Sequence, residues 1–318
     1  MNKVRTIFYG SGDFAVPILA RLLNMESVEV VSVVTQMDKP AGRNQELTPV
    51  PVKEFVNNSF PDLKVYTPVK YRLEEKQILG NEKPDLIVVA DYGQILPEFT
   101  INYPKYKCLN VHGSLLPDLR GAVPIPIAIL EGYEKTGVSI PIMTTGLDDG
   151  PILAFREVGI EEHDTTESLK QKLAENGADL LAQTIPLWLK GDIEPIPQDE
   201  SKATIADKNL IEKEKAKITS DTEPERAVRM VRAFYPWPIA WCEIELNGKA
   251  QRLKIYDAKL RRDFLEGKTG QIIRDKKTLV LNLKNGGLEL TEIQIEGKTK
   301  SNVLNYLYLV DCLLVGNS

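Results

Sequence analysis

The chain has 318 residues, of which 42% are apolar and 27% charged, and it contains no low-complexity tract. This composition is typical of a globular protein and excludes fibrous and disordered classes, while the length suits two domains. No apolar run approaches the ~20 residues that a membrane helix needs, so a membrane-spanning protein is not expected.

The cysteines and the N-terminus predict a cytoplasmic protein. Cys108, Cys242 and Cys312 stand far apart and show no metal-ligand spacing. They suit a reducing compartment, and no metal site is expected. The first residues enter a strand-like segment at once, which leaves no room for the apolar core of a signal peptide.

Charge is distributed unevenly along the chain. Residues 1–207 carry 20 basic and 30 acidic residues, a net charge of −10, whereas residues 208–318 carry 20 and 15, a net charge of +5. This imbalance is compatible with an ordinary solvated surface. It is also compatible with a C-terminal part that contacts a polyanion such as a nucleic acid.

The chain opens with a strand, a glycine turn, a helix and a second strand. Apolar runs at 4–9 and 28–35 flank the turn Gly10-Ser11-Gly12 and an amphipathic stretch. This pattern predicts a βαβ unit and therefore a parallel sheet. The turn lacks the third glycine of the dinucleotide fingerprint, and no acidic residue closes the second strand. A helix N-terminus at this turn could still receive an anionic or polar group of a ligand.

Residues 36–53 contain several prolines and few apolar side chains, which predicts a long loop with Lys39 and Arg43 as basic residues. Loops of this length in compact domains are usually functional or disordered. Helices and strands then alternate. Helices are expected at 52–58, 73–79, 124–131, 164–185 and 223–234, and strands at 64–66, 85–90, 136–143 and 152–160. The expected helix at 164–185 begins at Asp164-Thr-Thr-Glu167, which matches a capping box.

The expected fold class is α/β. Residues 1–189 are predicted to form a Rossmann-like, open and mostly parallel sheet with helices on both faces, and residues 190–208 a polar linker. Residues 209–318 contain five short alternating segments, which predict a small, OB-like β-barrel. A closing helix, or a helix and a tail, is expected at 303–315.

Asn110 and His112 are the first candidates for chemistry. Residues two apart on a strand point to the same side, so their amide and imidazole should face one space. His112 is one of two histidines and belongs to the type that changes charge near neutral pH, although a structural histidine is the alternative. The other, His163, is expected to be an exposed loop residue.

The glycine loop with Asp148 and Asp149 supplies carboxylates, or else only a polar turn. An amide, an imidazole and a carboxylate in one cleft suit acyl transfer. The amide stabilises the oxyanion, and the carboxylate orients the imidazole and accepts a proton. Because no Ser, Cys or Thr has a nucleophile-elbow context, direct transfer is expected.

The motif from Asn110 to Pro117, followed by Arg120-Gly121 and by Gly146-Leu-Asp-Asp-Gly150, resembles the formyltransferase family that uses 10-formyltetrahydrofolate. The resemblance implies that Asn110, His112 and Asp148 are catalytic. It also implies folate contacts from two segments, namely Ser114, Leu115, Leu116 and Pro117 in one and Asp91, Tyr92, Gly93 and Ile95 in the other.

Within that family the chain is similar to the members that formylate methionine on initiator tRNA. Four segments carry this likeness: 9–17, 36–53, 203–206 and 232–238. The likeness implies that initiator Met-tRNA is the partner, that Lys39 and Arg43 contact its acceptor end, and that the basic barrel contacts its backbone. We expect a monomer.

Several residues depart from the family pattern. Asn44-Gln45-Glu46 stand where glycine and lysines are usual, Pro126-Ile127 replace a polar pair, and Asp91 replaces an alanine. The main alternative is a sugar-nucleotide N-formyltransferase with the same donor and catalytic trio, although a small acceptor has no use for the long loop at 36–53. A deformylase and an inert RNA-binding module are further alternatives.

Overall fold

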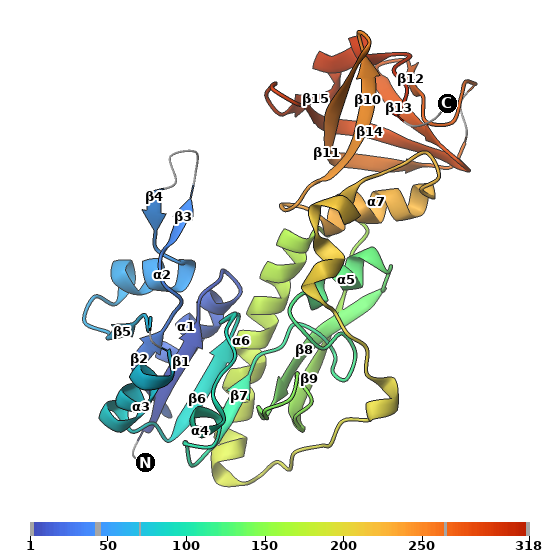
Figure 1. The fold of residues 1–318 in the computed structure, drawn as a ribbon. Helices are drawn as coiled ribbons and strands as arrows, with labels where there is room; N and C mark the ends of the chain where they lie inside the picture. Colours follow the sequence, from blue (N-terminus) through green and yellow to red (C-terminus); the bar gives the residue numbers. More distant parts are fainter. Residues whose placement is uncertain (1–2, 42–45, 70, 264–265, 316–318) are drawn as a thin grey trace. The chain divides into compact units, whose positions relative to one another are not determined.

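The computed structural model describes residues 3–41, 46–69, 71–263 and 266–315. The chain divides into two compact units (Figure 1). The N-terminal unit comprises residues 1–124, 135–159 and 170–206, and the C-terminal unit comprises residues 125–134, 160–169 and 207–318. Across these described residues, no helix is long and apolar enough to cross a membrane.

A five-stranded parallel sheet forms the centre of the N-terminal unit, with the order β5-β2-β1-β6-β7. The strands are β1 Val4–Gly10, β2 Val28–Val34, β5 Val65–Tyr66, β6 Leu86–Ala90 and β7 Cys108–Asn110. Every residue of β6 is buried, as is typical of a strand covered on both faces. The predicted α/β class with a parallel sheet is confirmed.

Helices cover the sheet on both faces. They are α1 Ala15–Leu23, α2 Pro51–Ser59, α3 Tyr71–Glu82, α4 Glu98–Ile101 and α6 Thr166–Lys190. Right-handed crossovers place α1 and α2 on one face and α3 and α4 on the other, and the contacts of α1 with α2 and of α3 with α4 agree. An ion pair between Arg21 and Asp179 joins α1 to α6.

Two hairpins complete this unit. Strands β8 (Lys135–Pro141) and β9 (Ile152–Gly159) pair with each other, and bridges from residues 139 and 142 attach them to the β7 segment. Strands β3 (Lys39–Ala41) and β4 (Glu46–Thr48) form a second hairpin. The prediction of an irregular loop over 36–53 was therefore wrong in part. A short two-stranded ribbon tolerates a proline where the ladder does not need its missing N–H group.

The C-terminal unit contains α5 (Pro124–Leu130), the first residues of α6, helix α7 (Pro224–Ala233) and an antiparallel sheet. Arg229 of α7 donates to the carbonyl oxygen of Leu130 at 3.1 Å.

The predicted capping box of α6 lies one residue further on. Thr165 and Ser168 exchange side-chain to backbone bonds at 3.0 and 3.2 Å, because the helix begins at Thr166.

The antiparallel sheet has the order β10-β11-β14-β13-β12, with β15 beside β14. Its strands are β10 Ala240–Leu246, β11 Lys249–Arg261, β12 Ile272–Asp275, β13 Thr278–Leu283, β14 Gly286–Ile295 and β15 Ser301–Asn302. A 3₁₀ helix follows at Val303–Leu309. Residues 313 and 314 then bond to both sheet edges. Glu245 donates to Leu313 O, and Leu314 donates to Gly270 O, each at 2.8 Å. The C-terminal segment thereby closes the predicted barrel and covers edges that would otherwise be open.

Candidate active site

The candidate site lies at the carboxyl edge of the parallel sheet, where the order of the strands reverses. Strand β1 pairs with β6 and β6 with β7, so the segments that follow these three strands emerge side by side. Ser11 and Gly12 both donate to the carbonyl oxygen of Asp91, at 3.0 and 3.3 Å. Ligands of open α/β folds bind at such an edge. The predicted proximity of the Asp91 and His112 loops is confirmed.

His112 is held on both sides by backbone groups. Its own N–H and C=O pair with Ser139 at 2.9 and 3.0 Å, and its side chain is buried, with 6% of its surface exposed. Ring atom Nε2 lies 3.0 Å from the carbonyl oxygen of Leu119. A carbonyl oxygen only accepts, so Nε2 carries a proton. Nδ1 is therefore the ring nitrogen that faces the other candidate groups.

Asp148 brings the three predicted catalytic side chains together. Its Oδ1 accepts from Asn110 Nδ2 at 3.4 Å, and its Oδ2 lies 3.8 Å from His112 Nδ1. Oδ2 also accepts from the backbone N–H of Gly121 at 2.9 Å. Asp149, in contrast, is exposed and accepts from the hydroxyl of Thr144 in its own loop. The geometry thus separates two adjacent carboxylates that the residue pattern alone leaves equivalent.

A second set of residues supports this arrangement and was not predicted. Gln198 Nε2 donates to the carbonyl oxygens of Asp148 and Gly150, both at 2.7 Å. Its Oε1 accepts from Arg120 Nε and Nη2, at 3.1 and 2.8 Å. Arg120, 6% exposed, also pairs with Glu200 at 2.7 Å and lowers the pKa of that carboxyl. We call Gln198, Arg120 and Glu200 the Gln198 brace. No sequence signal marks Gln198, because its partners lie 48, 50 and 78 residues away.

The first predicted folate segment is a turn that hydrogen bonds fix internally. The hydroxyl of Ser114 donates to Asp118 O at 2.6 Å and is 1% exposed. The N–H of Leu116 donates to Ser139 Oγ at 3.0 Å, and that hydroxyl donates to Ser114 O at 2.8 Å. Leu115 packs closely over Gly137, while Pro117 is half-buried. Because the side chain of Ser114 is used within the turn, a ligand would meet the backbone and the apolar side chains here.

The second predicted folate segment has one buried and one exposed apolar side chain. Tyr92 is 2% exposed and packs edge-on against Tyr9, with 5.3 Å between ring centroids. Ile95 is 90% exposed. Gly93 has a φ of +72°, in the left-handed region that favours glycine, where an added Cβ would also lie 2.6 Å from the side chain of Gln36.

Asp91 occupies the N-terminus of α1. Its carboxylate lies where a Cβ of Gly12 would project, only 2.0 Å from that position, and it accepts from the backbone N–H of Phe14. Desolvation of the carboxyl group by the surrounding protein atoms raises its pKa, although part of the residue is exposed to solvent. The protein thus supplies its own anionic group at the glycine turn, where we expected that a ligand could place one.

One of the two predicted tRNA-contacting residues lies in the β3–β4 hairpin. Lys39 begins β3 and is exposed. Arg43, Asn44 and Gln45 lie outside the described residues. At the base of the hairpin, Lys53 Nζ pairs with Asp38 at 2.9 Å. His163, in the C-terminal unit, is exposed as predicted.

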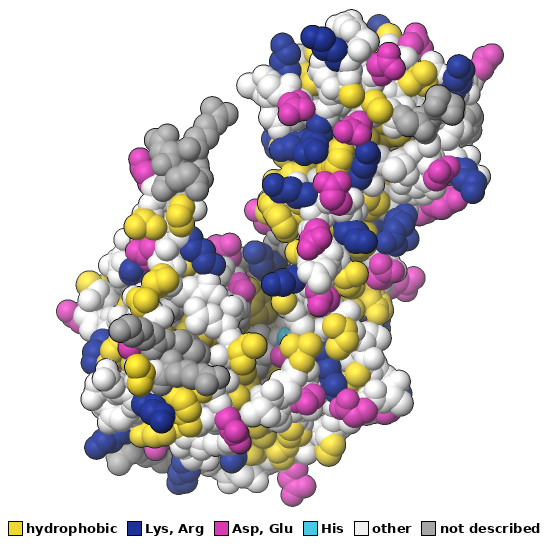
Figure 2. Space-filling view, viewed as in Figure 1, with side chains coloured by type: hydrophobic (Ala, Val, Ile, Leu, Met, Phe, Trp, Pro, Cys, Tyr) yellow, Lys and Arg dark blue, Asp and Glu magenta, His cyan; other side chains and the backbone are white. Residues whose placement is uncertain are grey.

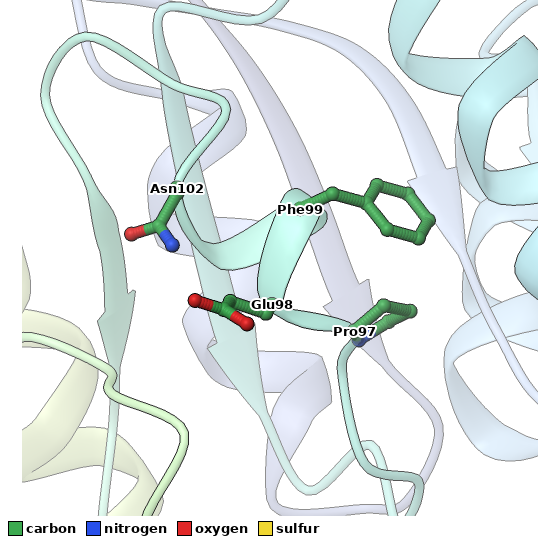
Figure 3. Close-up of a pocket in the computed structure, with 4 residues that line it drawn as sticks. All are labelled: Pro97, Glu98, Phe99 and Asn102. Atoms are coloured by element: carbon green, nitrogen blue, oxygen red, sulfur yellow. The ribbon is translucent and has the colours of Figure 1, made fainter.

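A hollow in the described surface lies elsewhere in the N-terminal unit. It has a volume of about 490 Å³ and is lined by Pro97, Glu98, Phe99 and Asn102, from α4 and its flanks (Figure 3). None of these residues is a predicted site residue, and no titratable pair converges there. We therefore assign the candidate site by its chemistry and not by volume.

Two family models match the chain. The model described as formyl transferase matches residues 2–185, and the model described as formyl transferase, C-terminal domain, matches residues 210–308. The chain is 43% identical over 308 residues to methionyl-tRNA formyltransferase of Bacillus licheniformis, covering 95% of this chain and 94% of that protein. It is 40% identical over 309 residues to methionyl-tRNA formyltransferase of Bacillus cytotoxicus, covering 96% and 95%.

Solved structures share the fold at lower sequence identity. HypX from Aquifex aeolicus, in complex with tetrahydrofolic acid, matches with a TM-score of 0.63 and 17% identity over 96% of this chain and 47% of that one. The N-formyltransferase from Helicobacter canadensis, in complex with folinic acid and dTDP-3-aminofucose, matches with a TM-score of 0.63 and 18% identity over 94% of this chain and 100% of that one.

Proposed function

The chain belongs to the formyl transferase family, and from this premise we propose that it transfers a formyl group from 10-formyltetrahydrofolate to the α-amine of methionine on initiator tRNA. The observation that carries the proposal is the convergence of an amide and an imidazole on one carboxylate: Asn110 Nδ2 lies 3.4 Å and His112 Nδ1 lies 3.8 Å from the oxygens of Asp148. The two relatives described above, at 43% and 40% identity, are both named methionyl-tRNA formyltransferase.

The proposed donor site is formed by the two segments after β6 and β7. Residues 91–95 and 114–117 follow adjacent parallel strands, so both border the same edge of the sheet. The internal hydrogen bonds of the 114–117 turn fix its shape before a ligand arrives, which lowers the entropy cost of binding. Structures with this fold that contain tetrahydrofolic acid or folinic acid agree with a folate donor.

The chemistry follows from which atoms are free. Nε2 of His112 is bonded to Leu119 O, so Nδ1 is the donor that can reach the formyl oxygen. As the amine nitrogen bonds to the formyl carbon, negative charge develops on that oxygen, and Asn110 Nδ2 and an imidazolium at His112 stabilise it. A single such donor contributes about 3 kcal/mol to transition-state stabilisation.

Asp148 completes the proposed reaction. Its carboxylate lies beside both donors, where it orients the imidazole and accepts a proton from the attacking amine. When the carbonyl re-forms, the bond between the formyl carbon and the folate nitrogen breaks. That nitrogen gains one proton as it leaves, which balances the proton that the amine loses.

The C-terminal unit supplies the proposed contact with the tRNA backbone. Residues 208–318 carry a net charge of +5, and Figure 2 shows Lys and Arg side chains interspersed with acidic ones over the surface of this unit. Arg252 stacks on the ring of Trp241, with its Cζ 4.0 Å from the centroid, and Lys217 Nζ lies 5.2 Å from the same centroid. Arg252 and Lys254 line a hollow of about 220 Å³. Such groups suit phosphate contacts.

The decisive experiment is a transfer assay with 10-formyltetrahydrofolate and two acceptors, methionine-charged initiator tRNA and an amino-sugar nucleotide. We expect formylation of the tRNA alone. Transfer to the sugar without transfer to the tRNA would refute the proposed acceptor and favour the sugar-nucleotide alternative.

The two histidines provide a matched pair of variants for the same assay. His112→Asn should abolish turnover, whereas His163→Asn, at the exposed histidine, should turn over at the parental rate. Parental turnover in His112→Asn would contradict the proposed role of the imidazole.

Arg43→Glu should impair use of the tRNA more than binding of the folate.

A further inference from the structure

The backbone of Asp148 needs an external support. Its φ is +48°, in the left-handed region that few residues other than glycine adopt. Its side chain sits at 3.4 Å from Asn110 Nδ2 and 3.8 Å from His112 Nδ1, distances that small movements would lengthen beyond useful contact. The contacts that fix Asp148 therefore decide whether its carboxylate stays beside Asn110 and His112.

The Gln198 brace holds the loop at two points. The amide of Gln198 has one orientation that satisfies all its neighbours, because the guanidinium of Arg120 only donates and the carbonyl oxygens of Asp148 and Gly150 only accept. Nε2 therefore faces the loop and bonds to the residues on either side of Asp149. Glu200 accepts from Arg120 Nη1 and Nη2 at 2.9 and 2.7 Å and fixes the guanidinium in turn.

The segment 196–206, which contains Gln198 and Glu200, also holds the part of the site that contains His112. Arg120 N donates to Thr204 O at 2.9 Å, and Ala206 N donates to Arg120 O at 2.7 Å. The next residue, Gly121, donates its N–H to Asp148 Oδ2 at 2.9 Å. Ile196 exchanges two 2.8 Å bonds with Ile152, just after the Asp148 loop. Residues 196–206 thus bond to both catalytic segments.

We propose that Gln198 is a positioning residue of the transfer reaction. By donating to the carbonyl oxygens of Asp148 and Gly150, it holds the Asp148 carboxylate against Asn110 and His112, with Arg120 and Glu200 fixing its own orientation. This inference rests on the proposed function. Displacements of about 1 Å in a catalytic group cost on the order of 10²-fold in rate, so loss of the brace should be visible in kcat.

The test uses Gln198→Glu, which keeps the shape and the pairing with Arg120 but cannot donate to the two carbonyl oxygens. We expect kcat to fall about 10- to 100-fold while the KM values for folate and tRNA stay at parental values. Gln198→Met removes the donor without adding charge, and we expect the same fall in kcat. It serves as the test variant if Gln198→Glu folds poorly. Gln183→Glu is the matched control. Gln183 also accepts from an arginine, at 2.9 Å from Arg156 Nη2, but lies on α6 away from the loop.

A double-mutant cycle separates positioning from a general structural role. If Gln198 acts through Asp148, then Gln198→Glu should cost almost nothing further in kcat once Asp148→Asn is present. Full additivity of the two losses would overturn the inference, as would a parental kcat in both Gln198 variants.

Imidazole NMR gives a readout that does not require turnover. The chain has two histidines, so His163→Gln assigns the remaining ring signals to His112. In Gln198→Glu these nitrogen signals should shift because the neighbouring carboxylate has moved, and unchanged signals would overturn the inference. If the signals shift but the parent protein transfers no formyl group, positioning of Asp148 stands and the proposed function fails.

Discussion

Glu75 is a buried carboxyl group with no cation beside it among the residues that the structure describes, and its replacement should make the protein more stable at high pH. It lies on α3 and is fully buried. Its Oε2 accepts from the hydroxyls of Tyr9 and Thr100 at 2.8 and 3.4 Å, and its Oε1 has no partner among the residues that the structure describes. Burial raises the pKa of this carboxyl, and the two hydroxyl bonds offset only part of that rise.

The sign of the effect follows from proton linkage. An unfolded glutamate has a pKa of about 4.3, and the folded value is higher. Between the two values the folded state binds more protons, so the free energy of unfolding falls as the pH rises. This contribution is fully present below the unfolded pKa and is lost as the pH rises through the folded pKa. A single proton limits the slope to about 1.4 kcal/mol per pH unit.

Glu75→Gln stays neutral at every pH, so its stability relative to the parent should increase from pH 4 to pH 8. Urea unfolding of both proteins across this range measures the difference. Glu98→Gln, at an exposed glutamate of α4, is the control and should show no such trend. A difference between Glu75→Gln and the parent that does not change with pH would refute the reasoning, because it would mean that Glu75 titrates alike in both states.

Three further predictions concern the supports of the candidate site and the proposed tRNA-binding surface. Ser139→Ala should lower the free energy of unfolding by about 1–3 kcal/mol in urea titrations and raise the KM for folate, because the buried N–H of Leu116 loses its acceptor. Gly137→Ala should destabilise by about 1–3 kcal/mol, measured in the same way, because the new Cβ would lie 2.2 Å from Arg156 O and 2.5 Å from Leu115. Arg252→Ala should weaken tRNA binding and reduce the salt-dependence slope of its affinity by about 1, measured by filter binding at several salt concentrations, and an unchanged slope would show that Arg252 contacts no phosphate.

Local sequence was sufficient to predict most of the fold. Continuous apolar runs such as 85–90 predicted buried parallel strands. The helix expected at 52–58 begins one residue earlier, at Pro51, whose fixed φ suits the first position of a helix. The β3–β4 hairpin was missed because its strands have only three residues each. All side chains of β4 are exposed, as are Lys39 and Pro40 of β3, so no period-2 pattern marks them. Helix α4 is a single turn and is too short for a helical period.

The candidate site likewise contains residues that local sequence could predict and residues that it could not. Asn110 and His112 could be paired from their spacing, since both lie at one strand end. The choice of Asp148 over Asp149 came from a family likeness. The geometry that distinguishes the two carboxylates depends on a hydrogen bond from Gly121, which lies 27 residues before Asp148 in the sequence. Gln198 and Glu200 lie in a polar, proline-containing stretch without periodicity. Side chains that act through single long-range hydrogen bonds leave no pattern in the sequence.

The distribution of charge indicates how the acceptor is held. The hairpin region 36–53 has a net charge of +1, and one of its basic residues, Lys53, is neutralised by Asp38 at 2.9 Å. Glu46 is an exposed acidic residue on β4. The region therefore offers few phosphate contacts. Residues 208–318 carry a net charge of +5 with cations on the ring of Trp241. Since phosphate contacts supply most of the non-specific affinity, we expect the barrel to provide affinity and Lys39 and Arg43 to position the acceptor end.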